Sequence, residues 1–223
     1  MVFNGYRSRR ERLSNIVRYV NEFALSKSVV QSNSRTVFYI IKLYTDKINI
    51  SMNEQLMTGT EIDKHLYPLG DFYDMVKTEV KINHDFWISL ARNPVLTKIW
   101  NKERLVENLS DVAEPDNPWK QDQNNHMFNI YLPMGITEIH NGNHSANSGI
   151  IKGEGAIKLV GNPSDDSPKT TIYDMSHLYD EYYYDGTYFR SKYDKHFKMK
   201  GTFESGCIFE IGRCIHEKGI SFI

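Results

Sequence analysis

The spacing of apolar residues changes near Pro94, and this change constrains the fold more than any other feature of the sequence. Before Pro94, apolar residues recur at the i, i+3, i+4, i+7 spacing that places them on one face of a helix. Four segments show this spacing: residues 13–24, 37–44, 72–80 and 86–91. The sequence therefore predicts a helical N-terminal region over residues 1–92, whose fourth helix ends before the proline.

Beyond Pro94, short runs of apolar and β-branched residues alternate with turn residues and short helical patterns. Asn101 is a predicted N-cap for a helix over residues 102–112, and residues 145–152 predict another short helix. Four segments predict strands: residues 94–100, 127–133, 136–140 and 156–160. This order predicts an α+β fold in which residues 93–223 form a small mixed-sheet domain.

The last part of the chain predicts a β-hairpin followed by a helix. Asp185 and Gly186 stand between two aromatic runs, and both tolerate the positive φ of a type I′ turn. Farther on, Cys207 and Cys214 share one helical face with several isoleucines, and Gly219 is the predicted C-terminal stop. We therefore predict that both cysteines are buried core residues.

Composition excludes several classes of protein. Hydrophobic residues make up 40% of the 223 residues and charged residues 25%, which is typical of a globular chain that buries a sizeable core. The net charge of −1 does not indicate a general nucleic-acid binder, although it leaves room for a local basic patch. No segment approaches about 18 consecutive apolar residues, and the N-terminus lacks the apolar core of a signal peptide. We therefore expect no membrane span. The two cysteines form no disulfide framework or zinc motif, which is typical of a reducing compartment, so we expect a cytoplasmic protein.

The stretch "IHNGNHSANSG", residues 139–149, leaves a predicted strand through a polar turn. Gly142 would allow the backbone to approach an anion closely, and His144 could donate a hydrogen bond to it. The first N–H groups of the following helix lack intrahelical partners, and the helix dipole favours negative charge there. An ordinary strand-to-helix connection without a ligand explains the same residues.

The order of elements around this turn resembles the ParB/sulfiredoxin-like superfamily. Its members include the ParB N-terminal domain, sulfiredoxin and free-serine kinases. The resemblance covers about residues 94–160 and is carried by five runs: "KERLVENLSDV" (102–112), "NIYLP" (129–133), "ITEIH" (136–140), "GNHS" (142–145) and "GAIKLV" (155–160). It implies a nucleotide- or phosphate-binding protein, for which a nucleotide with Mg²⁺ is one candidate ligand and phosphotransfer, NTP hydrolysis or nuclease chemistry are candidate activities. It also implies five phosphate-binding residues: Gly142, Asn143, His144, Ser145 and Asn147.

Two positions depart from the pattern of that superfamily. Ser145 stands where the family has an arginine, the residue that binds phosphate most strongly, and Asn141 stands where many relatives have an acid. Candidates for a catalytic role are Glu103, Glu107 and His144. The sequence therefore leaves two hypotheses: a nucleotide-binding domain, or a non-enzymatic protein- or nucleic-acid-interaction module that has lost the ligand site.

Other polar clusters have a structural and a functional interpretation. His126, His140 and His144 lack an acid or cysteine at the spacing of a metal motif, so we predict no metal site. The aromatic run at residues 179–197 suggests base stacking, but its acids would repel nucleic acid, which favours a half-buried hairpin or a protein contact. Four arginines near the first helix could contact nucleic acid or an acidic partner, or be solvated: Arg7, Arg9, Arg10 and Arg12.

Overall fold

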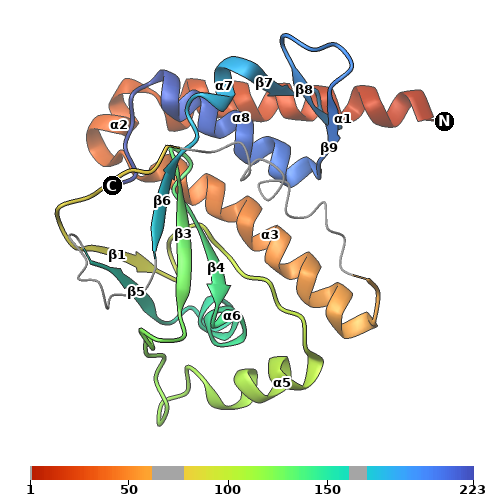
Figure 1. Ribbon diagram of the computed structural model, residues 1–223. Helices are drawn as coiled ribbons and strands as arrows, with labels where there is room; N and C mark the ends of the chain where they lie inside the picture. The colour runs from red at the N-terminus through yellow and green to blue at the C-terminus, as the bar shows by residue number, and fades with distance from the viewer. Residues whose placement is uncertain (1, 62–77, 161–169) are drawn as a thin grey trace.

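The computed structural model describes residues 2–61, 78–160 and 170–223, with side chains from residue 8 onward. The N-terminal region is helical, as predicted, and its elements run antiparallel and across one another (Figure 1). They are α1 (Val2–Tyr19), the π-helical turn η1 (Val20–Ala24), α2 (Lys27–Asn33) and α3 (Thr36–Thr58). The helix predicted at residues 72–80 falls mostly outside the described residues; of that segment, Val80 donates a backbone hydrogen bond to Ile172 at a sheet edge.

The fourth predicted helix, at residues 86–91, is wrong. These residues form strand β1 (Phe86–Ser89), which pairs antiparallel with β5 (Ala156–Leu159). Burial alternates along β1, since Phe86 is 8% and Ile88 0% exposed while Trp87 is 58% exposed. A short apolar run fits either period, and here the hydrogen bonds to a strand 70 residues later in the chain decide the conformation.

A four-stranded mixed sheet forms the centre of the molecule. Its order is β2 (Val95–Leu96), β4 (Ile136–Asn141), β3 (Met127–Leu132) and β6 (Thr171–Asp174). The β3–β4 pair is antiparallel, as the predicted strand pair requires, while β2 and β6 each join it in parallel. The strand predicted at 94–100 is confirmed only over two residues. The side chain of Asn49 on α3 fixes this strand, because it donates to the carbonyl of Val95 and accepts from the N–H of Thr97.

Two short helices flank the sheet at one end of the molecule (Figure 1). Helix α5 (Lys102–Asp111) begins as predicted, because the Asn101 side chain accepts a hydrogen bond of 2.8 Å from the N–H of Arg104. Helix α6 (Asn143–Lys152) begins two residues earlier than predicted, directly after Gly142. The chain therefore passes from β4 into α6 through one residue.

The C-terminal part forms a hairpin sheet and a long helix at the other end of the molecule (Figure 1). After the short α7 (Leu178–Glu181), the strands β7 (Tyr182–Tyr184), β8 (Tyr188–Ser191) and β9 (Lys198–Lys200) pair in antiparallel order. The predicted hairpin is confirmed, but its turn is not type I′, because Gly186 has a positive φ and Asp185 does not. The side chain of Asp185 fixes the turn by accepting from the N–H groups of Thr187 and Tyr188. Gly186, at φ 101°, lies against the backbone of Arg10, so α1 passes directly beside this turn.

Helix α8 (Phe203–Glu217) joins the two predicted regions. It packs against α1 and α3, and the buried side chains of the helices and the sheets form one continuous hydrophobic cluster. Cys207 and Cys214 are 0% and 2% exposed, which confirms the prediction that they are core residues. Gly219 follows the helix at φ 62°, as predicted. Within the described ranges, no helix has the length and apolar character needed to cross a bilayer.

Candidate functional site

The N-terminus of α6 presents backbone donors after a left-handed glycine. Gly142 has φ 77° and ψ 22°, and the first helical hydrogen bond runs 3.0 Å from the N–H of Ala146 to the carbonyl of Gly142. The N–H groups of Asn143, His144 and Ser145 precede this bond, and no residue that the structure describes accepts from them. These three groups and the dipole of a ten-residue helix make a favourable position for an anion.

The side chains of this turn are held by other parts of the chain. Asn143 accepts a 2.6 Å bond from the N–H of Lys98, and Asn147 exchanges two amide hydrogen bonds with Asn53 on α3. His144 is 7% exposed, and its Nε2 accepts from the N–H of Asn101 at 3.3 Å. The neutral ring therefore carries its proton on Nδ1. Of the five predicted phosphate-binding residues, Asn143 and Asn147 fix the turn, whereas His144 retains a donor for a ligand.

His126 and Ser145 form a close pair that resembles a catalytic base and its nucleophile. The tautomer of His126, however, is the wrong one for a base. The Nε2 atom of His126 lies 2.7 Å from Oγ of Ser145, and its Nδ1 accepts from the N–H of Asp122 at 2.8 Å. An Nδ1 that accepts leaves the proton on Nε2, so the ring donates to the serine and cannot remove its proton. Ser145 Oγ donates in turn to the carbonyl of Gly142 at 3.0 Å. This pair closes the turn, and it is not set up for nucleophilic catalysis.

His126 also explains why position 142 is a glycine. A Cβ at Gly142 would lie 2.3 Å from Cδ2 of His126. The sequence suggested that Gly142 leaves space for an anion, but on this side of the glycine the imidazole ring of His126 occupies that space. Burial lowers the pKa of His126, in agreement with a ring that stays neutral. Within the described ranges, no group of three or more His, Cys, Asp or Glu side chains could hold a metal ion.

An exposed aromatic ring and an arginine lie beside His144. The ring of Trp100 is 62% exposed and meets the His144 ring edge-on, with centroids 5.5 Å apart. The guanidinium of Arg104 lies 5.4 Å from the centre of the Trp100 ring and forms no ion pair with any residue in the described ranges. Burial lowers the pKa of His144, and the charge of Arg104 acts in the same direction. Sequence reasoning missed both Trp100 and Arg104, although the Asn101 cap places them around the start of one helix.

A buried carboxylate lies on β4, four residues before Gly142. Glu138 is 0% exposed, and its Oε1 pairs with Nζ of Lys98 at 3.0 Å. The hydroxyl of Tyr131 donates to Oε2 at 3.4 Å, and His140 Nε2 lies 3.7 Å from the same oxygen. The sequence-predicted acids Glu103 and Glu107 are instead exposed on α5. Sequence reasoning missed Glu138, which reads as an ordinary polar residue of a strand.

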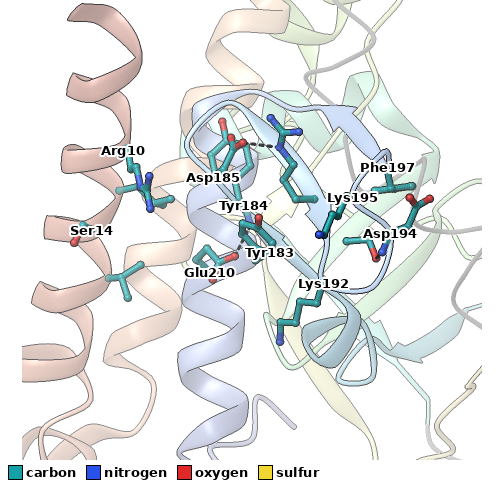
Figure 2. Close-up of a pocket in the computed structure, with 14 residues that line it drawn as sticks. Arg10, Ser14, Tyr183, Tyr184, Asp185, Lys192, Asp194, Lys195, Phe197 and Glu210 are labelled. Carbon is teal, nitrogen blue, oxygen red and sulfur yellow. Dashed lines mark hydrogen bonds and ion pairs between the residues drawn. The ribbon is translucent and has the colours of Figure 1, made fainter. Parts of the chain in front are cut away.

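A second hollow lies between α1 and the hairpin sheet, at the other end of the molecule (Figure 2). It has a volume of about 830 Å³ and is lined by Arg10 on one side and by Lys192 and Lys195 on the other. Of the four predicted arginines, Arg12 stacks on the ring of Phe203 at 4.7 Å, Arg9 and Arg10 are exposed, and the side chain of Arg7 lies outside what the structure describes.

A comparison with family models matches residues 3–222, nearly the whole chain, to one model, described as "Family of unknown function (DUF6710)". The chain belongs to this family. No curated protein and no solved structure matches the chain.

For this DUF6710 chain, the structure brings His144 and Ser145 together at the turn that the sequence singled out. It adds Trp100 and Arg104 from a segment that only the fold places nearby, and Glu138 from the strand that leads into the turn. The aromatic run forms a half-buried hairpin, as predicted: Tyr184 is 4% exposed and Tyr183 41%. The ParB/sulfiredoxin-like resemblance stays a prediction.

Proposed function

We propose that this protein binds a nucleotide, with a phosphate group at the N-terminus of α6. The observation that carries the proposal is the set of three unpaired N–H groups, from Asn143 to Ser145, that follow the left-handed Gly142. Phosphate oxygens accept such bonds readily, and the helix dipole adds to the attraction. The Nδ1–H of His144, in the first turn of the same helix, would be a further donor if it reaches the phosphate. The turn needs no rearrangement on binding, since side-chain bonds already fix it.

Arg104 supplies the positive charge that Ser145 lacks. The superfamily pattern has an arginine at position 145, but here the serine hydroxyl is engaged by His126 and Gly142. Arg104 comes from α5, carries no ion pair within the described ranges, and lies close enough to His144 to affect its pKa. A guanidinium there can form charge-assisted bonds to a phosphate beside the helix.

Trp100 favours a nucleotide over inorganic phosphate. The ring of Trp100 is 62% exposed beside the turn, and any base can stack on such an aromatic face. Arg104 already lies over this ring, so the phosphate and base contacts would come from adjacent side chains. Stacking does not distinguish one base from another, so the base is left open.

Catalysis is a further step of the proposal and follows from the resemblance to phosphotransfer enzymes. Glu138 is the acid nearest to the turn along β4, and Lys98 holds its charge in place. No ready-made cluster of three metal-ligating side chains occurs in the described ranges. A Mg²⁺ ion would therefore enter with the nucleotide phosphates, which supply much of its coordination in many enzymes.

A second candidate function rests on a separate observation. Helices α1, α2 and α3 with η1 enclose an apolar groove of about 950 Å³. Four large side chains on its rim are 44–63% exposed: Tyr19, Phe23, Tyr39 and Leu43. Apolar surface of this kind is typical of protein–protein contacts. It supports the interaction-module alternative, in which the turn at Gly142 has only a structural role.

Calorimetric titration with ATP and CTP in the presence of Mg²⁺ distinguishes the two candidates. We expect Arg104→Gln to weaken binding by about tenfold, since a charge-assisted hydrogen bond contributes roughly 1.5 kcal/mol or more. The matched control is Arg92→Gln, which removes the same charge from an exposed position in the β1–β2 connection. If neither nucleotide binds the wild-type protein, or if both variants bind equally well, the nucleotide proposal fails and the interaction module stands.

A further inference from the structure

We propose that the pocket between α1 and the β7–β9 sheet is a second ligand site, which binds a small organic phosphate with an aromatic body. The pocket lies at the opposite end of the molecule from α5 and α6 and shares no residue with the turn at Gly142 (Figures 1 and 2). Its volume of about 830 Å³ is in the range of small-molecule sites. This proposal is independent of the nucleotide proposal.

The charges of the pocket set the class of ligand. Two of its acids are neutralised by neighbours, because Asp185 pairs with Arg190 at 2.7 Å and Glu210 pairs with Arg213 at 2.8 Å. The remaining ionisable groups of the lining are three cations and one acid: Arg10, Lys192, Lys195 and Asp194. They leave an excess of two positive charges, which matches a phosphate monoester of charge about −2 near neutral pH.

The loop that carries both lysines is fixed before any ligand arrives. The hydroxyl oxygen of Ser191 accepts from the N–H groups of Tyr193 and Asp194, each at 3.1 Å. The carboxylate of Asp194 accepts from the N–H of His196 at 2.8 Å, and Lys192 Nζ donates to the carbonyl of Tyr179 at 2.7 Å. A loop held this way loses little entropy when it binds a ligand. The hydrogen bond from His196 also partly offsets the negative charge of Asp194, so this carboxylate repels an anion less.

The pocket also offers aromatic surface. Tyr183, which is 41% exposed, and Phe197 line it, the latter within the same loop as the lysines. Figure 2 shows Arg10 projecting from α1 toward the hairpin sheet that carries these residues. Ring faces next to cations suit a ligand whose planar body lies against Tyr183 or Phe197 while its phosphate reaches Arg10 or Lys195. Inorganic phosphate would contact the cations of the pocket but not its aromatic rings.

Titration with phenyl phosphate, followed by calorimetry, tests the proposal. We expect saturable binding that is tighter than that of inorganic phosphate and that weakens with salt. Arg10→Ala and Lys195→Ala should each weaken it by about threefold to tenfold, the range for one partly exposed charge contact. Lys200→Ala is the matched control, since it removes an exposed charge from β9 outside the pocket. Circular dichroism and melting curves check that each variant is folded.

Two further results separate this pocket from the site at α6. Arg104→Gln should leave phenyl phosphate binding unchanged, and amide resonances of Tyr193 and Asp194 should shift during the titration. The proposal is overturned if phenyl phosphate does not bind the wild-type protein at millimolar concentration. It is also overturned if Arg10→Ala and Lys195→Ala bind as tightly as Lys200→Ala, or if only Arg104→Gln weakens binding.

Discussion

Ser145 has a structural role that its position in the sequence conceals. Its hydroxyl accepts from buried His126 and donates to Gly142. In Ser145→Ala the N–H of His126 loses its acceptor, so we expect a loss of about 1–2 kcal/mol in the free energy of unfolding. Ser110→Ala is the control, because that hydroxyl donates only to the carbonyl of Val106 on an exposed face of α5. Urea unfolding of both variants gives the comparison, and equal losses would contradict this role.

The same contacts predict the effect of Ser145→Arg, the substitution that restores the arginine of the superfamily. It removes both hydrogen bonds and places a guanidinium near His126, whose ring packs against that of Trp119 with centroids 4.9 Å apart. We therefore expect a lower melting temperature and no gain in phosphate affinity. Tighter nucleotide binding by this variant would show that position 145 faces the ligand after all.

Protonation of the turn histidines should make stability depend on pH. Burial lowers the pKa of both His126 and His144 below the ordinary value of 6.5. As the pH falls below about 6.5, the unfolded chain takes up protons that the folded protein does not, so stability falls. Urea unfolding at about pH 7.5 and pH 5.5 should show this loss, and His126→Gln should reduce it. His84→Gln, at an exposed position, is the control and should leave the pH dependence as in the wild type.

The two cysteines should be inert in the folded protein. Burial is the main cause that raises the pKa of Cys207 to about 12 and that of Cys214 above its ordinary value. Only the thiolate reacts with a thiol reagent such as a disulfide. We expect slow labelling of the native protein and rapid labelling of both thiols in denaturant, and rapid native labelling would contradict the packing of α8.

Helix α6 begins and ends at a left-handed glycine, and the two glycines differ in their surroundings. A Cβ at Gly153 would have no atom within 4 Å, whereas at Gly142 it would lie 2.3 Å from His126. Gly153→Ala should cost about 1–2 kcal/mol from backbone strain alone. Gly142→Ala should cost about 1 kcal/mol or more beyond that, because the imidazole must also move. Equal losses in urea unfolding would mean that His126 does not hold the start of α6.

Local signals explain which elements could be predicted from the sequence. The Asn101 cap and the hairpin at Asp185 and Gly186 form from residues a few positions apart, so both are confirmed, although the turn is not type I′. The apolar spacing of residues 86–91 also fits a helix, and the helix prediction there is wrong. The strand forms because these residues pair with β5, which lies far away in the chain. The π-helical turn η1 lay inside a predicted helix and gave no signal of its own.

The candidate site was predictable only in part for the same reason. The turn at Gly142 is a local feature, and its position between β4 and α6 followed from the pattern of apolar residues. Trp100 and Arg104 are about 40 positions away from His144, and they meet it only because Asn143 and His144 bind the segment after β2. Contacts of this kind require the tertiary structure.

At the scale of the whole molecule, the two proposed sites occupy opposite ends (Figure 1). The hairpin pocket lies beside α1, and the N-terminal helices and α8 share one core with the sheet that carries β4. We therefore expect the variants at one site to leave ligand binding at the other unchanged, as distant sites with no shared partners usually behave independently.

Amide NMR can test whether the first N–H groups of α6 bind a nucleotide phosphate. In a titration of the ¹⁵N-labelled protein with ATP and Mg²⁺, the amide resonances of Asn143, His144 and Ser145 should move first and most, together with the indole N–H of Trp100. Amides at the C-terminal end of α6, near Gly153, should stay in place. A titration in which these three amides do not respond, or respond no more than the end of α6, would contradict the claim.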